Sequence, residues 1–291
     1  PFSGTAGFHL SGLYSPWVDI AELAKLFLES KHTGQEALRV FVNTVLAQSW
    51  EEDEGDGVET NDIMSRAEKF ETVLPAKEIG VLCASADVQA DRIEVLVNGY
   101  SANQTWIVGF QIFYGSPTSE SLWNEVEEYL KTTWPHPSGN DLRITRSFID
   151  SGYETGAVYN FCKKLEALGV RAIKGVGGIN RAEVGRPTKN NTARCNVFPL
   201  GVNTLKTQIL ARLKIDDPSN SGFINFPDFL DEEFFLQLTS ERLIKKYVKG
   251  IPRMEFKQLR PRNEALDLMV YNLAAFRSLN ANMAIIQKKL A

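Results

Sequence analysis

The sequence predicts an α/β protein in which a mixed β-sheet is flanked by helices. Residues 81–100 contain two apolar runs around the polar stretch 89–92, a pattern typical of two antiparallel strands joined by a turn. A third apolar run follows at 105–113, and beyond it strand-like segments alternate with amphipathic helices. Adjacent strands at the start and helix-linked strands afterwards together favour a mixed sheet.

The sheet and its helices are predicted to form one domain, residues 76–291. Its first strand is apolar up to Asp87, so we expect this strand to be buried on both faces. Strands are predicted at 81–87, 93–100, 105–113, 144–149, 170–175 and 222–227, with a hairpin at 247–257; helices are predicted at 119–130, 155–168, 202–213, 234–243 and from 263 onward.

Residues 1–75 lack this pattern and are predicted to form a mostly helical N-terminal segment. Helices are expected at 19–28, 35–41 and 62–72. The stretch 51–57 is acidic and contains glycine, so it cannot bury apolar area and is predicted to be a linker. Because the first residue is Pro1 rather than Met, we interpret the chain as a piece of a longer polypeptide.

Composition limits the class of protein. An apolar fraction of 43% and a charged fraction of 23% are ordinary for a soluble globular chain, and no apolar run approaches the roughly 20 residues of a membrane span. The isolated cysteines Cys83, Cys162 and Cys195 predict reduced structural thiols and argue against a zinc site. With only three histidines, a His-dependent nuclease or a Ser-His-Asp hydrolase is hard to build.

Charge is distributed unevenly along the chain. The net charge is −4, yet the residues from Lys163 to Arg262 contain 19 Lys/Arg against 10 Asp/Glu, a local balance of +9 that leaves −13 on the rest. A basic face on an acidic molecule favours a polyanionic partner. The alternative explanation is that these basic residues form an ordinary solvated helix surface.

Three acidic residues interrupt elements that are otherwise apolar. Asp87 ends the first strand, Asp150 ends the strand predicted at 144–149, and Asp267 lies one turn into the last helix. If the two strands are neighbours, Asp87 and Asp150 meet at one edge of the sheet, where the helix can present Asp267. Three such acids repel one another and take up protons unless divalent cations neutralise them.

Each acid also has an ordinary structural explanation. Asp87 can tip into the turn that follows it, Asp150 can cap the next turn, and Asp267 can be a surface acid of its helix. Glu264 lies on nearly the same helix face as Asp267, but the helix dipole favours an acid in a first turn anyway. Asp91 can satisfy turn amides or pair with the arginine after it.

Carboxylate oxygens are hard ligands that favour Mg²⁺ or Mn²⁺. Two such ions roughly 3.5–4 Å apart can activate a water molecule and stabilise the leaving oxygen of a phosphodiester. The leading hypothesis is two-metal hydrolysis, with Asp87 bridging both ions and Asp150 and Asp267 holding one each.

A Gly-rich basic loop follows the strand at 170–175. It resembles a phosphate-cradling loop because glycines let backbone N–H groups approach an anion, but the Walker A spacing is absent from the chain. Contact with a DNA backbone suits it better. The residues expected to bind DNA are Lys174, Arg181, Arg186, Lys189, Arg194 and Arg262.

Short motifs occur in a specific order along the chain. They are Gly7-Phe8-His9-Leu10, Leu13-Tyr14-Ser15-Pro16-Trp17, Phe41-Val42-Asn43-Thr44, Ala86-Asp87-Val88-Gln89 with Asp91-Arg92, Ile149-Asp150-Ser151-Gly152, Ile173-Lys174-Gly175 and Arg262-Asn263-Glu264-Ala265-Leu266-Asp267. Together they resemble the lambda-like large terminase subunit of tailed phages. The resemblance extends from the first residues to about Arg277.

This resemblance implies the C-terminal nuclease portion of that subunit, with an RNase H-like fold. No P-loop is present, so residues 1–75 would join the nuclease domain to an absent ATPase motor. The implied activity is metal-dependent endonuclease cleavage of concatemeric double-stranded viral DNA at cohesive-end sites. The family's acidic cluster carries over onto Asp87, Asp150 and Asp267, and Glu264 or Asp91 can take a ligand role instead.

The resemblance also implies partners and a place of action. The partners are the DNA, the small terminase subunit, the portal protein and the ATPase domain of the same polypeptide, without a membrane. The place is the cytoplasm of a bacterial host, at the procapsid. Two other classes remain: an actin-like or sugar-kinase-like ATP-binding domain, which needs paired phosphate loops, and a non-catalytic module that docks on DNA or the portal.

Overall fold

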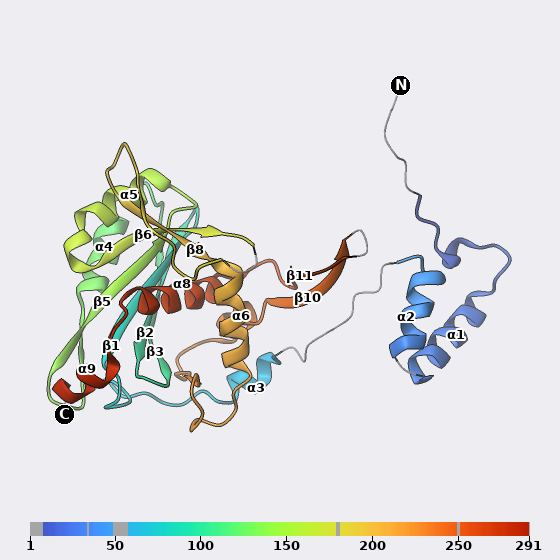
Figure 1. Ribbon diagram of the computed structural model, residues 1–291, viewed down its shortest axis with the longest axis horizontal. Helices are drawn as coiled ribbons and strands as arrows, with labels where there is room; N and C mark the ends of the chain where they lie inside the picture. Colours follow the sequence, from blue (N-terminus) through green and yellow to red (C-terminus); the bar gives the residue numbers. More distant parts are fainter. Residues whose placement is uncertain (1–7, 34, 49–57, 179–180, 249–250, 291) are drawn as a thin grey trace. The chain divides into compact units, whose positions relative to one another are not determined.

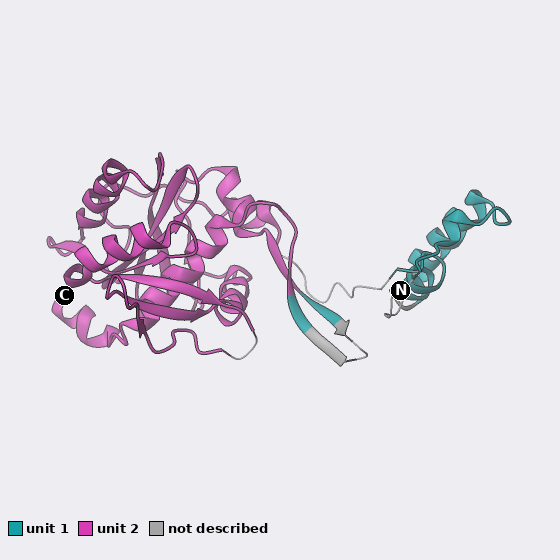
Figure 2. Cartoon of the chain, turned by 90° about the horizontal axis from the view of Figure 1, so that it is seen from above, with its two compact units in different colours: residues 1–55, 244–255 teal, residues 56–243, 256–291 magenta. Residues whose placement is uncertain are grey.

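The computed structural model describes residues 8–33, 35–48, 58–178, 181–248 and 251–290 (Figure 1). It divides into two compact units, residues 1–55 with 244–255 and residues 56–243 with 256–291 (Figure 2). The domain boundary expected after residue 75 stays a prediction. The expected linker at 51–57 lies outside the described residues.

The first unit contains two packed helices. These are α1 (Ile20–Thr33) and α2 (Gln35–Thr44), preceded by the short 3-10 helix η1 (Gly12–Tyr14). The rings of Phe27 and Phe41 lie 5.6 Å apart between their centroids, and the Gly12 N–H donates to the Val45 carbonyl. The helices predicted at 19–28 and 35–41 are therefore confirmed, and both extend further at their C-terminal ends.

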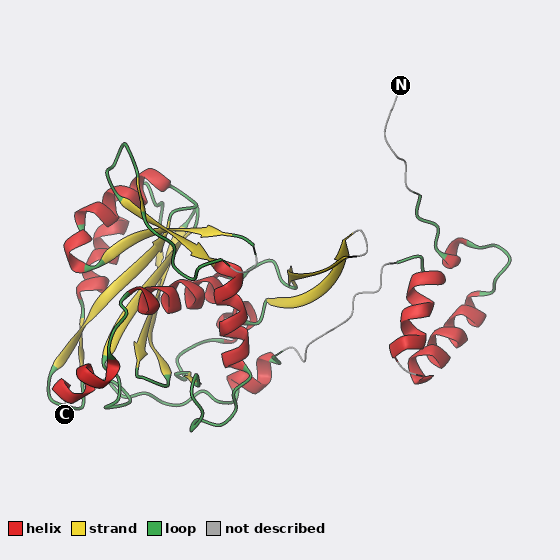
Figure 3. Ribbon diagram, in the orientation of Figure 1, coloured by secondary structure: helices red, strands yellow, loops and turns green. Residues whose placement is uncertain are grey.

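The second unit is built on one mixed sheet (Figure 3). Its strands are β1 (Val81–Val88), β2 (Arg92–Tyr100), β3 (Thr105–Tyr114), β4 (Thr133–Pro135), β5 (Asp141–Asp150), β6 (Val170–Val176), β7 (Thr188–Lys189), β8 (Asn196–Gly201) and β9 (Ile224–Asn225). The order is β7-β8-β6-β5-β1-β2-β3-β9, with β4 paired to β5. β1, β2 and β3 are antiparallel, whereas β1, β5, β6 and β8 are parallel.

Helices cover both faces of this sheet. One face carries α6 (Val202–Leu213), α7 (Glu232–Leu238) and α8 (Glu264–Ser278), and the other carries α4 (Glu120–Lys131) and α5 (Thr155–Lys164). The short helices α3 (Thr60–Met64), η2 (Glu166–Leu168) and α9 (Met283–Leu290) complete the unit. This architecture confirms the predicted mixed sheet flanked by helices.

β1 lies at the centre of the core, as its apolar sequence predicts. Every residue of the strand is buried, and alternate side chains enter different hydrophobic clusters. Val81 and Cys83 contact the cluster formed with α8, whereas Leu82 and Ala84 contact the cluster formed with α4 and α5. The alternation places the odd-numbered side chains of β1 on the α8 face.

Several predicted elements differ from the structure. The helix predicted at 62–72 is only α3, and the helix predicted at 234–243 ends at Leu238. Residues beyond Ser240 form β10 (Glu241–Val248), which pairs with β11 (Ile251–Gln258) in a hairpin longer than expected. β8 is absent from the prediction because it contains Pro199, a residue that disfavours an inner strand.

None of the described helices combines the length and the apolar character that a membrane crossing requires.

Candidate metal and DNA site

Two of the predicted acids meet at one edge of the sheet. β1 and β5 are parallel neighbours, and their last paired residues are Ala86 and Ile149. Asp87 and Asp150 are the next residues of these two strands, where they pair with Glu94 of β2 and Ile173 of β6, so both lie at the same end of the parallel pair. Phe148 and Cys83 belong to the α8 cluster, and side chains alternate along a strand, so both acids lie on the α8 face.

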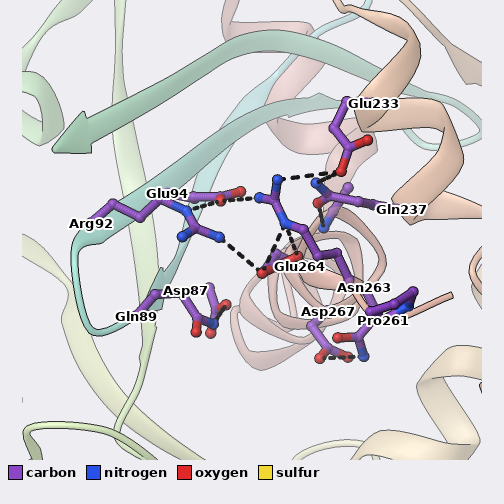
Figure 4. Close-up of polar contacts among 12 residues, drawn as sticks. Asp87, Gln89, Arg92, Glu94, Glu233, Gln237, Pro261, Asn263, Glu264 and Asp267 are labelled. Carbon is purple, nitrogen blue, oxygen red and sulfur yellow. Dashed lines mark hydrogen bonds and ion pairs between the residues drawn. The ribbon is translucent and has the colours of Figure 1, made fainter.

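The third acid reaches this edge because α8 is fixed to the sheet. The buried Asn272 amide donates to the Cys83 and Leu96 carbonyls at 3.2 and 3.0 Å. The Ser85 hydroxyl donates to the Leu268 carbonyl at 2.8 Å. These bonds hold the N-terminal turn of α8 above the ends of β1 and β5, and Asp267 lies in that turn (Figure 4).

The three carboxylates affect one another electrostatically. Burial raises the pKa of Asp87 to about 7, and the nearby charges of Asp150 and Asp267 add to the rise. Burial also raises the pKa of Asp150 and of Asp267. The folded chain therefore places three acids where their negative charges are poorly solvated and mutually repulsive.

Asp87 and Asp150 have few protein partners. The Gln89 side-chain amide donates to Asp87, and the Gly152 N–H donates to Asp150 at 3.0 Å. A Cβ atom at Gly152 would lie 2.8 Å from Asp150 Oδ2, so only glycine leaves this carboxylate in place. Asp150 thus caps the next turn, as its alternative explanation predicts, and also faces the acidic edge.

Asp267 has a cationic partner that the sequence analysis missed. Lys206 Nζ lies 3.0 Å from Asp267 Oδ1 and 2.6 Å from Glu241 Oε1, and the lysine side chain is only 11% exposed. Burial opposes the charged lysine, but the two carboxylates outweigh it and raise its pKa. Asn263 donates to both of these carboxylates at 2.8 and 3.0 Å.

Glu264 belongs to a second cluster of charges, on the same turn of α8. Arg92 donates to Glu94 at 2.7 Å and to Glu264 at 3.0 Å. Arg262 contacts Glu94, Glu264 and also Glu233 at 3.1 to 3.3 Å. Glu94 is 1% exposed, so its buried negative charge needs these arginines as compensation.

Asp91 lies outside the acidic edge. Its carboxylate is 71% exposed and pairs with Arg92 at 2.8 Å, which is the alternative that the sequence offered for it. The structure therefore brings Asp87, Asp150 and Asp267 together, with Glu264 beside them and paired to arginines.

The donor set suits a hard divalent cation. It consists of carboxylate oxygens, the ligand type that such ions prefer, and burial raises the pKa of all three carboxyl groups. Within the described ranges, no three carboxylate, thiol or imidazole groups are arranged to hold one ion together. In this arrangement both oxygens of Asp267 are engaged by Lys206 and Asn263.

All six residues expected to bind DNA are exposed, and five of them lie on β6 or in the segment between β6 and β8. These five are Lys174, Arg181, Arg186, Lys189 and Arg194. Lys174 lies close enough to Asp150 for its charge to oppose the raised pKa of that carboxyl. Arg262 differs, since its guanidinium is engaged by three glutamates. All three cysteines are buried and free, as predicted.

Comparison with known proteins identifies relatives over almost the whole chain. Residues 5–289 match the sequence family described as terminase large subunit gpA, endonuclease domain. The terminase large subunit of Escherichia phage lambda is 30% identical over 279 residues, and that of Enterobacteria phage P21 is 30% identical over 281 residues. Each alignment covers 93% of this chain and 43% of the relative, so the chain spans less than half of those proteins.

Solved structures resemble the chain more distantly. The human cytomegalovirus terminase nuclease domain has a TM-score of 0.42 and 12% identity, covering 79% of this chain and 98% of that one. A mutant nuclease domain of the large terminase subunit gp2 of bacterial virus Sf6 has a TM-score of 0.40 and 10% identity, covering 74% of this chain and 97% of that one. The assignment of a family therefore depends on the sequence matches, which are long and continuous. By those matches, this chain belongs to the family of the endonuclease domain of the phage terminase large subunit gpA.

Proposed function

We propose that this chain is a metal-dependent DNA endonuclease that cleaves concatemeric double-stranded viral DNA at cohesive-end sites during packaging. The observation that supports this most is the convergence of Asp87, Asp150 and Asp267 from β1, β5 and α8 at one sheet edge. Membership of an endonuclease-domain family supports the same reaction class.

Asp87, Asp150 and Asp267 would hold Mg²⁺ or Mn²⁺, as two ions. When bound, such ions activate a water molecule and neutralise the charge that develops on a phosphodiester during hydrolysis. Asp87 must be ionised to act as a ligand, and its pKa of about 7 places that change in the neutral range. To hold a cation, ionised Asp267 must give up its contact with the Lys206 ammonium.

Lys206 and the arginine pairs would position the acids. Without a cation, the Lys206 ammonium compensates Asp267 and Glu241, which keeps the site folded. The contacts of Glu264 with Arg92 and Arg262 favour a positioning role for this acid over a ligand role. Asp91 is exposed and paired with Arg92, which likewise disfavours a ligand role for this acid.

The exposed basic residues near this edge would bind the DNA backbone. Lys174 lies beside Asp150, and the charged side chains from Arg181 to Arg194 follow it in the chain. Phosphate contacts of this kind position a duplex without reading its sequence. Recognition of a cohesive-end site would then come from the small terminase subunit.

Further partners would be the ATPase domain of the same polypeptide and the portal protein, at the procapsid in the bacterial cytoplasm. The relatives are more than twice as long as this chain, so a motor domain has room in such a polypeptide. The first unit carries large apolar side chains that are mostly exposed, such as Trp17 at 90% and Ile20 at 72%. Exposed apolar residues of this size suit a contact with another domain.

Cleavage of plasmid DNA in the presence of Mn²⁺ tests the proposal. We expect Asp87→Ala, Asp150→Ala and Asp267→Ala each to lower the cleavage rate by about 100-fold or more, because each removes a ligand oxygen. Asp141→Ala is the matched control, since this exposed acid lies at the opposite end of β5 from Asp150. If Asp87→Ala cuts as fast as Asp141→Ala, the proposed site is wrong.

A further inference from the structure

A polar cavity lies at the far end of α8 from the acidic edge. Its volume is about 250 Å³, and it is lined by the turn that joins β2 to β3, the last turns of α6 and α8, and residues 221–222. Asp267 and Arg277 are ten residues apart on α8, so the cavity is about 15 Å from the acids along the helix axis. It is therefore separate from the proposed nuclease site.

Two arginines face this cavity without enough negative charge to balance them. Arg212 is half-buried; its burial lowers its pKa, as does the neighbouring charge of Arg277. Within the described part of the chain, the Arg212 guanidinium has no hydrogen bond or ion pair. The nearest acid is Glu183, and its carboxylate lies 3.7 Å from Arg277.

The remaining lining supplies hydrogen-bond donors and a rigid wall. The side chains of Asn103 and Ser221 are exposed and make no hydrogen bonds to other described residues. Phe276 stacks on Tyr100 with ring centroids 4.1 Å apart and planes within 2° of parallel. The Tyr100 hydroxyl donates to Asn272, so this wall is fixed to the buried network beneath α8.

We propose that this cavity is a binding site for a phosphate group. Two guanidinium groups that repel each other are stabilised together by an anion that accepts from both, and arginine forks match the oxygens of a phosphate. Asn103 and Ser221 add neutral donors at the same opening. The phosphate group comes either from a small anion or from the backbone of bound DNA.

Binding measured without metal ions tests this site separately from nuclease activity. The probes are inorganic pyrophosphate and a short DNA duplex, each titrated in EDTA at constant ionic strength. The variants are Arg212→Met and Arg277→Met, which remove one guanidinium each. The control is Arg143→Met, an exposed arginine of β5 that does not line this cavity.

We expect Arg212→Met and Arg277→Met to weaken pyrophosphate binding at least about tenfold, and Arg143→Met to bind like the parent chain. If the phosphate belongs to DNA, the same two variants also weaken duplex binding. Each then reduces the slope of log K against log salt by about 0.9, the contribution of one phosphate contact. If it belongs to a small anion, duplex binding stays at the level of the control.

Equal binding of both probes by all four proteins, or no binding by the parent chain, would overturn the proposal. Arg277 is 46% exposed, so Arg277→Met keeps the test valid if Arg212→Met does not fold. These binding measurements contain no metal ion. They are therefore independent of the cleavage test, and evidence against a role of Asp87 in cleavage would not change their result.

Discussion

Asp87 destabilises the folded chain in the absence of a cation. Its pKa is about 7 in the folded state and about 4 in an unfolded chain, so the folded state binds the extra proton between these values. As the pH rises, the unfolded state releases this proton at a lower pH than the folded state does. The free energy of unfolding therefore falls between about pH 4 and pH 7. The difference corresponds to at most about 4 kcal/mol above pH 7.

Replacing Asp87 with Asn removes this penalty while keeping an oxygen for Gln89 to bond. We expect Asp87→Asn to raise the melting temperature of the metal-free protein by about 5 °C or more at pH 8, and by less than about 1 °C at pH 4. Thermal unfolding in EDTA across this pH range measures the difference.

The control for this prediction is Asp141→Asn, a replacement of an exposed acid at the other end of β5. Its melting temperature should follow that of the parent chain at every pH. A constant gain for Asp87→Asn from pH 4 to pH 8 would contradict the prediction, because a gain without pH dependence does not come from titration of the carboxyl.

The sequence contains enough information to select the three acids, but not their partners. Asp87, Asp150 and Asp267 stand out because each ends or interrupts an apolar run. Lys206 shares a helix face with Val202 and Ile209, which is a detectable sign of burial. Its carboxylate partners come from residues 35 and 61 positions away, and only the tertiary fold brings them together.

At the scale of elements, Lys206 joins α6 to α8 and to the start of β10. The lysine is 11% exposed, and its partners Glu241 and Asp267 are 8% and 23% exposed. Removing one member of a buried ion pair leaves the other charge uncompensated, which is strongly destabilising. Loss of the Lys206 ion pairs is therefore expected to lower stability more than loss of an ion pair on the surface of this protein.

We expect Lys206→Met to lower the free energy of unfolding by about 3–5 kcal/mol at neutral pH in EDTA, measured by urea unfolding. Adding Glu241→Gln to that variant should recover part of the loss, because one of the two unpaired charges is then gone. Lys214→Met is the matched control, since Lys214 is exposed at the end of the same helix. Equal stability of Lys206→Met and Lys214→Met would contradict the interpretation of the pair as structural.

Prediction of elements from sequence succeeds where their signals are local. β1 to β3 follow one another along the chain with clear turns, so their antiparallel pairing is readable from residues 81–114. β8 is not readable in this way, because its partner β6 lies 20 or more residues earlier and Pro199 obscures its pattern. The end of α7 is likewise decided by the pairing of β10 with β11 rather than by helix propensity.

At the scale of the whole molecule, a net charge of −4 coexists with a local basic stretch. Part of that stretch is neutralised within the fold, since Arg262, Lys163, Lys164 and Lys206 all form ion pairs. The loop after β6 differs, because Arg186 and Lys189 are exposed and form no ion pairs with described residues. The sequence predicts the charge, and the structure separates the free cations from the paired ones.

Salt dependence of DNA binding measures how many of these free cations contact phosphate. We expect Arg186→Gln with Lys189→Gln to reduce the slope of log K against log salt by about 2, because each phosphate contact contributes about 0.9. Lys288→Gln with Lys289→Gln removes the same charge from exposed positions of α9 and should leave the slope unchanged. Because both double variants have the same net charge, a slope that falls equally in the two would mean that the duplex responds to overall charge and does not contact the loop.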